Sequence, residues 1–240
     1  MESVGNEITH EFRFFRVHRD GRIEKFIPTH KIPPFNDPTT GVQSKDVVIS
    51  NKPPVSARIF LPRIIDTTRK LPRPPPACYE DSWAGLQWIA SHANGNGPEP
   101  WLNEHADLNR VFVGGDSGGG DITHTLVVRV GSIGLPGLKV IGAILVHPFF
   151  GGMEDDEMWL YMFPTSGGLE DPRLKPPAEE LSRLGGIGGS YYEELKKSGW
   201  GGSGEVVEHH GEDHVFHLMK PDSENAVDLV NKFASFIVQG

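Results

Sequence analysis

The chain has 240 residues, of which 37% are hydrophobic and 23% charged, and its formal net charge at pH 7 is −9. A chain of this length can bury one substantial core, so we expect one α/β domain over residues 1–240, with residues 1–40 as an N-terminal arm. The acidic balance argues against nucleic acid and anionic membranes as partners, because a phosphate-binding surface needs an excess of lysine and arginine.

The N-terminal half is predicted to hold four strands and one helix. Asp20-Gly21 separates two apolar stretches, which is typical of a β-hairpin turn. The predicted strands are Phe12–His18, Arg22–Phe26, Val47–Ile49 and Val55–Leu61. A helix is predicted from about Asp81 to His92, because its apolar residues share one face and Gly95 follows its end.

The C-terminal half alternates strands with helices. In chain order the predicted elements are a strand at Val111–Val113, a helix through Ile122 and Val130, a strand at Val140–Val146, a short helix at Tyr191–Lys197, a strand at Glu205–Glu208 and a helix at Ser223–Val238. The continuous apolar run Val140–Val146 is typical of a strand buried on both faces of a parallel sheet. This alternation indicates an α/β fold with a mainly parallel sheet flanked by helices.

One segment carries the main chemical signal. The sequence Gly115-Asp116-Ser117-Gly118-Gly119 follows an apolar strand and precedes a predicted helix. That order matches the nucleophile elbow of α/β-hydrolases, in which a serine lies on a sharp strand-to-helix turn. Glycine is needed on both sides, because the turn is strained and neighbouring backbones pass too closely for a Cβ atom. The competing interpretation of Ser117 is a turn serine in a glycine-rich loop.

Together with four other segments, the elbow resembles the plant carboxylesterases, a fold-3 family in the hormone-sensitive-lipase-like branch of the α/β-hydrolases. The resembling segments are Gly41–Ile49, Tyr79–Trp83, Gly115–Gly119, His147–Phe150 and Asp213–His217. They run from the N-terminal arm to the last predicted helix, so the resemblance covers nearly all of the chain. It implies an α/β-hydrolase fold.

The resemblance also implies roles for individual residues. Ser117 would be the nucleophile, His214 its general base, and the backbone N–H of Gly118 a donor to the oxyanion hole. A solvated loop histidine is the alternative for His214. Neither a cofactor nor a metal is expected, because the His, Glu and Asp residues around His214 have no recognisable ligand spacing.

Two pieces of the family pattern are missing. No His-Gly-Gly sequence exists in the chain, so we expect a strand and the oxyanion loop to be lost near residues 72–73. A second loss is expected near residues 185–190, where the family has a strand and the triad aspartate. The triad acid therefore stays unknown, since Glu212 and Asp213 adjoin His214 too closely to orient its ring. Central strands would be absent, through a gene-model error or a truncated variant, unless the Gly185–Gly189 junction is a genuine flexible linker.

These observations predict a serine carboxylesterase that hydrolyses small carboxylic esters through an acyl-enzyme, with impaired activity. One alternative is a non-catalytic small-molecule-binding protein similar to the gibberellin receptors, although those relatives lose the histidine that is kept here as His214. A second is a hydroxyisoflavanone-dehydratase-like lyase, although such relatives often carry threonine where this chain has Ser117. The third is an inactive truncated product.

The cellular setting is inferred from what the chain lacks. A single cysteine, Cys78, excludes an internal disulfide and suits a reducing compartment. No apolar run is long enough to span a bilayer, and Met1–Gly5 lacks the features of a signal peptide. We therefore expect a cytoplasmic protein, with the nucleus left open, whose partner is a small-molecule ester; the oligomeric state is not indicated.

Overall fold

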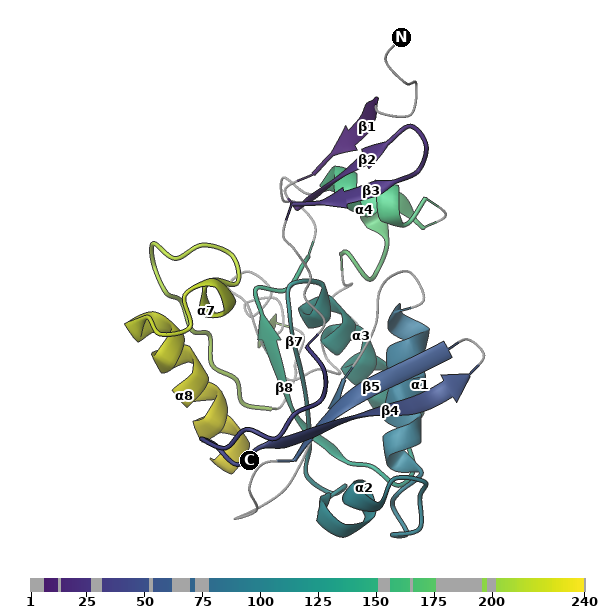
Figure 1. Ribbon diagram of the computed structural model, residues 1–240, viewed down its shortest axis with the longest axis vertical. Coiled ribbons are helices and arrows are strands. Elements are labelled where there is room, and N and C mark those ends of the chain that lie inside the picture. The colour runs from purple at the N-terminus through teal and green to yellow at the C-terminus, as the bar shows by residue number, and fades with distance from the viewer. Residues whose placement is uncertain are drawn as a thin grey trace.

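The computed structural model (Figure 1) describes most of the chain. The described residues are 7–12, 14–26, 32–51, 54–61, 70–71, 78–150, 156–164, 166–175, 196–197 and 202–239. Both expected junctions, near 72–73 and 185–190, lie outside these residues. The helix predicted at Tyr191–Lys197 does so too, apart from residues 196 and 197, which are helical.

The N-terminal strands form a small antiparallel sheet. β1 (Ile8–Glu11), β2 (Phe15–His18) and β3 (Ile23–Lys25) pair in that order. The predicted hairpin is confirmed, and Gly21 supplies its turn with φ 82°. The strand predicted over Phe12–His18 is confirmed but begins only at Phe15; before it, the Phe12 N–H donates to the Phe15 carbonyl at 2.9 Å.

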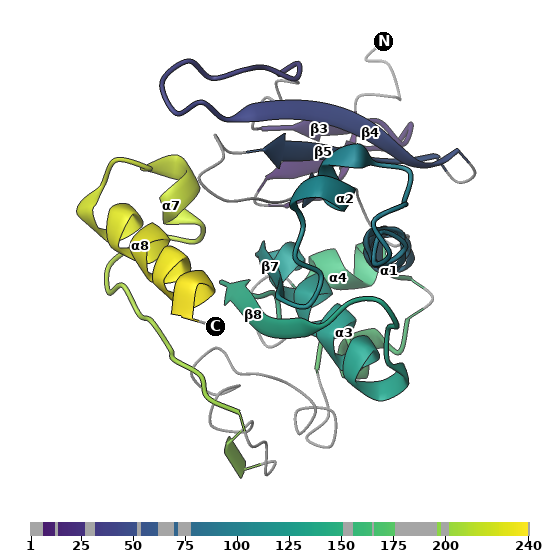
Figure 2. The same cartoon turned by 90° about the horizontal axis from the view of Figure 1, so that it is seen from below.

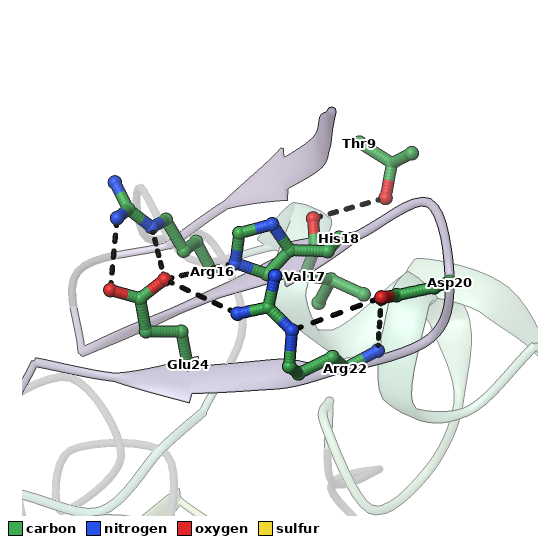
Figure 3. A network of polar contacts seen from close by, with 7 residues as sticks. All are labelled: Thr9, Arg16, Val17, His18, Asp20, Arg22 and Glu24. Atoms are coloured by element: carbon green, nitrogen blue, oxygen red, sulfur yellow. Dashed lines mark hydrogen bonds and ion pairs between the residues drawn. The ribbon is translucent and has the colours of Figure 1, made fainter. Parts of the chain in front are cut away.

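A polar cluster ties β2 to β3 (Figure 3). The Glu24 carboxylate accepts hydrogen bonds from Arg16 Nη2 at 2.9 Å and Arg16 Nε at 3.0 Å. His18 Nε2 lies 2.9 Å from the same carboxylate. Hydrogen bonding from Arg16, and then from His18, lowers the pKa of Glu24 to about 2. Opposite charges on neighbouring strands thus help to fix the hairpin register.

This sheet packs against α4 (Asp156–Met162), as Figure 1 shows. The Tyr161 ring of α4 lies 4.8 Å from the His10 ring and 5.5 Å from the Phe12 ring, centroid to centroid. The segment after α4 contains a short 3-10 helix, η2 (Gly168–Glu170). The N-terminal arm is therefore held by aromatic contacts with a segment that follows it by about 150 positions.

A second antiparallel sheet holds β4 (Gln43–Asn51), β5 (Pro54–Leu61) and β6 (Lys70–Leu71). Both predicted strands are confirmed in this region, and each is longer than expected. Along β5 the buried residues alternate, at Val55, Ala57 and Ile59, so one face of the strand is turned to the core. In Figure 2, α1 and α2 lie between this sheet and α3.

The parallel part of the fold is the pair β7 (Val111–Asp116) and β8 (Val140–Val146), which α3 (Gly118–Ile133) connects. The helix α1 (Cys78–Ala90) packs against α3 and begins three residues before the predicted start. Glu80 and Asp81 lie in its first turn, where acidic side chains favour a helix. The buried hydrophobic core between α1, α3 and β7 consists of Trp83, Leu86, Ile89, Leu102, Leu108, Val111, Val113 and Leu126.

On the side of β8 away from α3 lie α7 (Phe216–Met219) and α8 (Glu224–Gln239). The short helix α2 (Pro100–His105) lies beside α1. Val146, Phe216, Ala226 and Leu229 form the buried cluster there. Within the described part of the chain, no helix is long and apolar enough to cross a membrane.

The strand predicted at Glu205–Glu208 is wrong. This segment has no regular structure and lies across a cavity of about 350 Å³ from β8. Because the cavity separates the two backbones, the segment cannot form a hydrogen-bonded ladder with β8. Among the described strands, β8 pairs only with β7.

We expect Gly142→Ala to destabilise the fold by about 1–3 kcal/mol, because overpacking has that cost. A Cβ atom at Gly142 would lie 2.5 Å from the Phe112 ring and 3.0 Å from the Phe236 ring of α8. Gly85→Ala is the matched control: its Cβ meets nothing closer than Ile49 at 3.9 Å, so a gain of about 0.5–1 kcal/mol is expected in this helix. Urea unfolding measures the stability of both variants. A Gly142→Ala protein as stable as the wild type would contradict this packing of α8.

Candidate active site

Ser117 lies at a strained turn between β7 and α3. Its backbone has φ 54° and ψ −123°, a region that residues other than glycine rarely occupy. A Cβ atom at Gly115 would collide with the backbone of Gly119, and one at Gly120 would lie 2.9 Å from Pro148. The glycines are therefore required by close backbone approach, as the elbow geometry demands.

The imidazole of His214 is in hydrogen-bond contact with this serine. His214 Nε2 lies 2.9 Å from Ser117 Oγ, although 97 positions separate the two residues in the chain. At this distance a neutral imidazole can accept the hydroxyl proton as the oxygen attacks an electrophile. The structure thus brings together the two residues that the sequence selected as nucleophile and base.

Gly118 is the first residue of α3. The N–H groups of a first helical turn have no acceptor within the helix, and the helix dipole favours negative charge there. A Cβ atom at Gly118 or Gly119 would meet no atom within 4 Å, so the space beside this helix end is open. The predicted donor is therefore placed where an oxyanion next to Ser117 could be bound.

The two acids next to His214 in the sequence are Glu212 and Asp213. Asp213 Oδ1 accepts the backbone N–H of His214 at 2.7 Å. The Glu212 carboxylate is bound by Lys220 Nζ at 3.1 Å and Asn225 Nδ2 at 2.9 Å. His209 Nε2 lies 3.0 Å from Asp228 Oδ2. The triad acid is not assigned by these contacts.

A buried carboxyl group that the sequence did not single out lies one turn into α3. Asp121 is 2% exposed; its Oδ2 accepts a hydrogen bond from Tyr79 Oη at 2.6 Å, and its Oδ1 has no partner among the described residues. Burial raises the pKa of Asp121 to about 7, although the Tyr79 hydrogen bond and the charge of Arg173 act against this rise. Burial, followed by the charge of Asp121, also raises the pKa of Tyr79.

Arg173 lies close to this carboxyl group but is already paired. Its guanidinium donates two hydrogen bonds to Asp171, each 2.8 Å long. It also lies over the rings of Tyr79 and Phe163, 5.2 Å from each centroid. Asp121 is therefore a buried acid that the folded state keeps protonated up to about pH 7, and position in the sequence alone could not have shown this.

We expect Asp121→Asn to make stability less dependent on pH. The pKa of Asp121 is raised in the folded state, so its contribution to stability is fully present below about pH 4 and is lost as the pH rises towards 7. The wild type should lose up to about 1.4 kcal/mol per pH unit relative to the variant over that range. Urea unfolding of both proteins from pH 4 to 8 measures the difference, and a constant difference would contradict the buried, protonated state.

Comparison with known proteins gives the family. Residues 72–167 match a family model described as the alpha/beta hydrolase fold. The chain is 34% identical to probable carboxylesterase 5 of Arabidopsis thaliana, over 99% of this chain and 100% of that protein. It is 35% identical to probable carboxylesterase 1 of the same plant, over 93% and 95% of the two chains. It is also 33% identical to 2-hydroxyisoflavanone dehydratase of Glycyrrhiza echinata, over 93% and 94%.

The alignment also shows that internal residues are missing. The comparison with carboxylesterase 5 spans 321 positions, whereas this chain has 240 residues, so at least 81 positions have no counterpart here. Because both chains are covered almost from end to end, the missing positions are internal. With the α/β-hydrolase fold and identities above 30% over nearly its whole length, the chain belongs to the plant carboxylesterase family of the α/β-hydrolases.

Proposed function

We propose that this protein hydrolyses small carboxylic esters through an acyl-enzyme on Ser117. The observation that carries the proposal is the 2.9 Å contact between Ser117 Oγ and His214 Nε2 at a strained strand-to-helix turn. A serine hydroxyl is a weak nucleophile, so a base within hydrogen-bond reach is the feature that distinguishes a reactive serine from a turn serine. Membership of a carboxylesterase family supports the same assignment.

The proposed reaction has two halves. Ser117 Oγ attacks the ester carbonyl while His214 takes its proton, and the negative oxygen is stabilised by the Gly118 N–H at the start of α3. The intermediate collapses when His214 returns the proton to the leaving alcohol. Water, activated by His214, then attacks the acyl-serine and releases the carboxylic acid.

We also propose that turnover is impaired. The chain has no His-Gly-Gly sequence, so the other backbone donors of the family's oxyanion hole have no counterpart. Loss of one such donor lowers the rate by about 10²- to 10³-fold. The site would then retain its nucleophile and base while stabilising the developing charge less well.

A second candidate function is the elimination of water from a 2-hydroxyisoflavanone. It is favoured by one observation: relatives from Glycyrrhiza echinata and Glycine max, 33% and 32% identical, are named 2-hydroxyisoflavanone dehydratases. Elimination next to a carbonyl requires a base and a site for the oxyanion, but no bond to Ser117. Incubation with a 2-hydroxyisoflavanone, with Ser117→Ala alongside, separates the two functions, because only dehydration should survive in that variant.

We expect Ser117→Ala and His214→Asn each to lower kcat for a short-chain nitrophenyl ester by about 10³-fold or more, because nucleophile and base act as a unit. A fluorophosphonate probe should label the wild type at Ser117 and should leave Ser117→Ala unlabelled. Spectrophotometric rates and mass spectrometry of the labelled peptide are the measurements.

His210→Asn serves as the matched control, because His210 is exposed and lies 4.0 Å from Glu208 rather than at Ser117. Its rate should equal that of the wild type. If folded wild-type protein, shown by a cooperative thermal transition, neither hydrolysed the ester nor reacted with the probe, the esterase proposal would be wrong.

A further inference from the structure

The end of β8 lies between the nucleophile and the base and contacts both. The Ser117 N–H donates to the Val146 carbonyl at 2.8 Å, and the Ser117 carbonyl accepts the Phe149 N–H at 3.2 Å. Between these two positions, His147 Nδ1 accepts the backbone N–H of Val215 at 2.9 Å. One short segment therefore holds the strained elbow on one side and the loop that carries His214 on the other.

The contact with Val215 restrains a strained backbone. Val215 has φ 52° and His147 has φ 44°, and a β-branched residue such as valine is especially unfavourable in this region. Such a conformation persists only where surrounding contacts hold it. Val215 is 8% exposed and Phe216 2% exposed, and Phe216 packs on Val146, so burial and the His147 hydrogen bond hold the same turn.

The turn fixes the base. His214 immediately precedes Val215, and its ring lies 5.4 Å from the ring of His147, centroid to centroid. A displacement of about 1 Å between reacting groups can cost about 10²-fold in rate. We propose that His147 is a positioning residue for the base, holding His214 against Ser117 by accepting the Val215 N–H. The inference rests on the proposed esterase function and extends it to a residue outside the Ser117–His214 pair.

The role requires a particular protonation state. Nδ1 accepts a hydrogen bond only when it carries no proton, so His147 must be neutral with its proton on Nε2. Burial lowers the pKa of His147, and the neighbouring His214, His217 and His209 lower it further, while Asp116 at the end of β7 raises it. These surroundings keep the ring an acceptor at neutral pH. In acid, the protonated ring would release the Val215 N–H.

Activity in acid therefore depends on two protonations, one on the base and one on His147. The acid limb of log kcat against pH should approach a slope of about 2 in the wild type over the roughly 10- to 100-fold range that His147 controls, because protonation of either ring removes a required interaction. His147→Asn places a non-titrating amide oxygen close to the position of Nδ1. This variant should keep kcat within about threefold of the wild type and show a slope of about 1. A merely structural role for His147 would not change the slope.

His147→Leu removes the acceptor and should lower kcat by roughly 10- to 100-fold and change KM less, because displacement of His214 from Ser117 acts on the chemical step. Amide hydrogen exchange at Val215, measured by NMR without any substrate, should be fast in His147→Leu and slow in both the wild type and His147→Asn. Thermal melts establish which variants are folded.

The exchange measurement separates this inference from the esterase proposal. If the wild type proves inactive but Val215 is deprotected in His147→Leu, the esterase proposal fails while His147 is still shown to hold the loop. If Val215 exchanges equally slowly in all three folded proteins, or if folded His147→Leu keeps the wild-type kcat, His147 does not position the base and the inference is overturned.

Discussion

The strained turn at Ser117 is the constraint on which the site depends. The serine lies at φ 54°, and the chain can reverse there only because Gly115 and Gly120 have no Cβ atoms to meet Gly119 and Pro148. The parallel pair β7–β8 and the helix α3 form the frame that holds this turn, through hydrogen bonds from both sides of the elbow to the end of β8. Removal of that frame would let the backbone relax, and Oγ would no longer be directed at His214.

Backbone strain gathers at the same place. Among the described residues, three that are not glycine have positive φ: Ser117, His147 and Val215. The first belongs to the nucleophile turn, the second to the end of β8, and the third follows the base. Each is unfavourable by itself, so the packing of Phe216 against Val146 and the hydrogen bonds between these segments must hold them together. The site is therefore held by mutual contacts among three strained loops rather than by any one of them.

Local signals in the sequence predicted local structure well. The Asp20-Gly21 turn, the elbow and the histidine loop each depend on neighbours in the chain, and the structure places Ser117 and His214 in contact. The predicted strand at Glu205–Glu208 failed because pairing needs a strand beside it, and a cavity separates it from β8. The burial of Asp121 and the His147–Val215 contact depend on residues 42 and 68 positions away, which no local pattern encodes. The identity of the triad acid stays unknown, and the domain boundaries remain a prediction.

The missing internal positions lie outside the segments that bring Ser117 and His214 together. The contacts that hold Ser117 and His214 lie within residues 111–150 and 213–229, and neither stretch contains an expected junction. The strands β4–β6 precede the first junction, and β7 and β8 follow it. Among the described residues, these two groups of strands form separate sheets. An oxyanion hole needs donors from a second loop, and the base of a catalytic triad also needs an acid that orients its ring. The contact between Ser117 and His214 is therefore formed in a chain that lacks at least 81 positions of its relative, because the segments that hold it are all present.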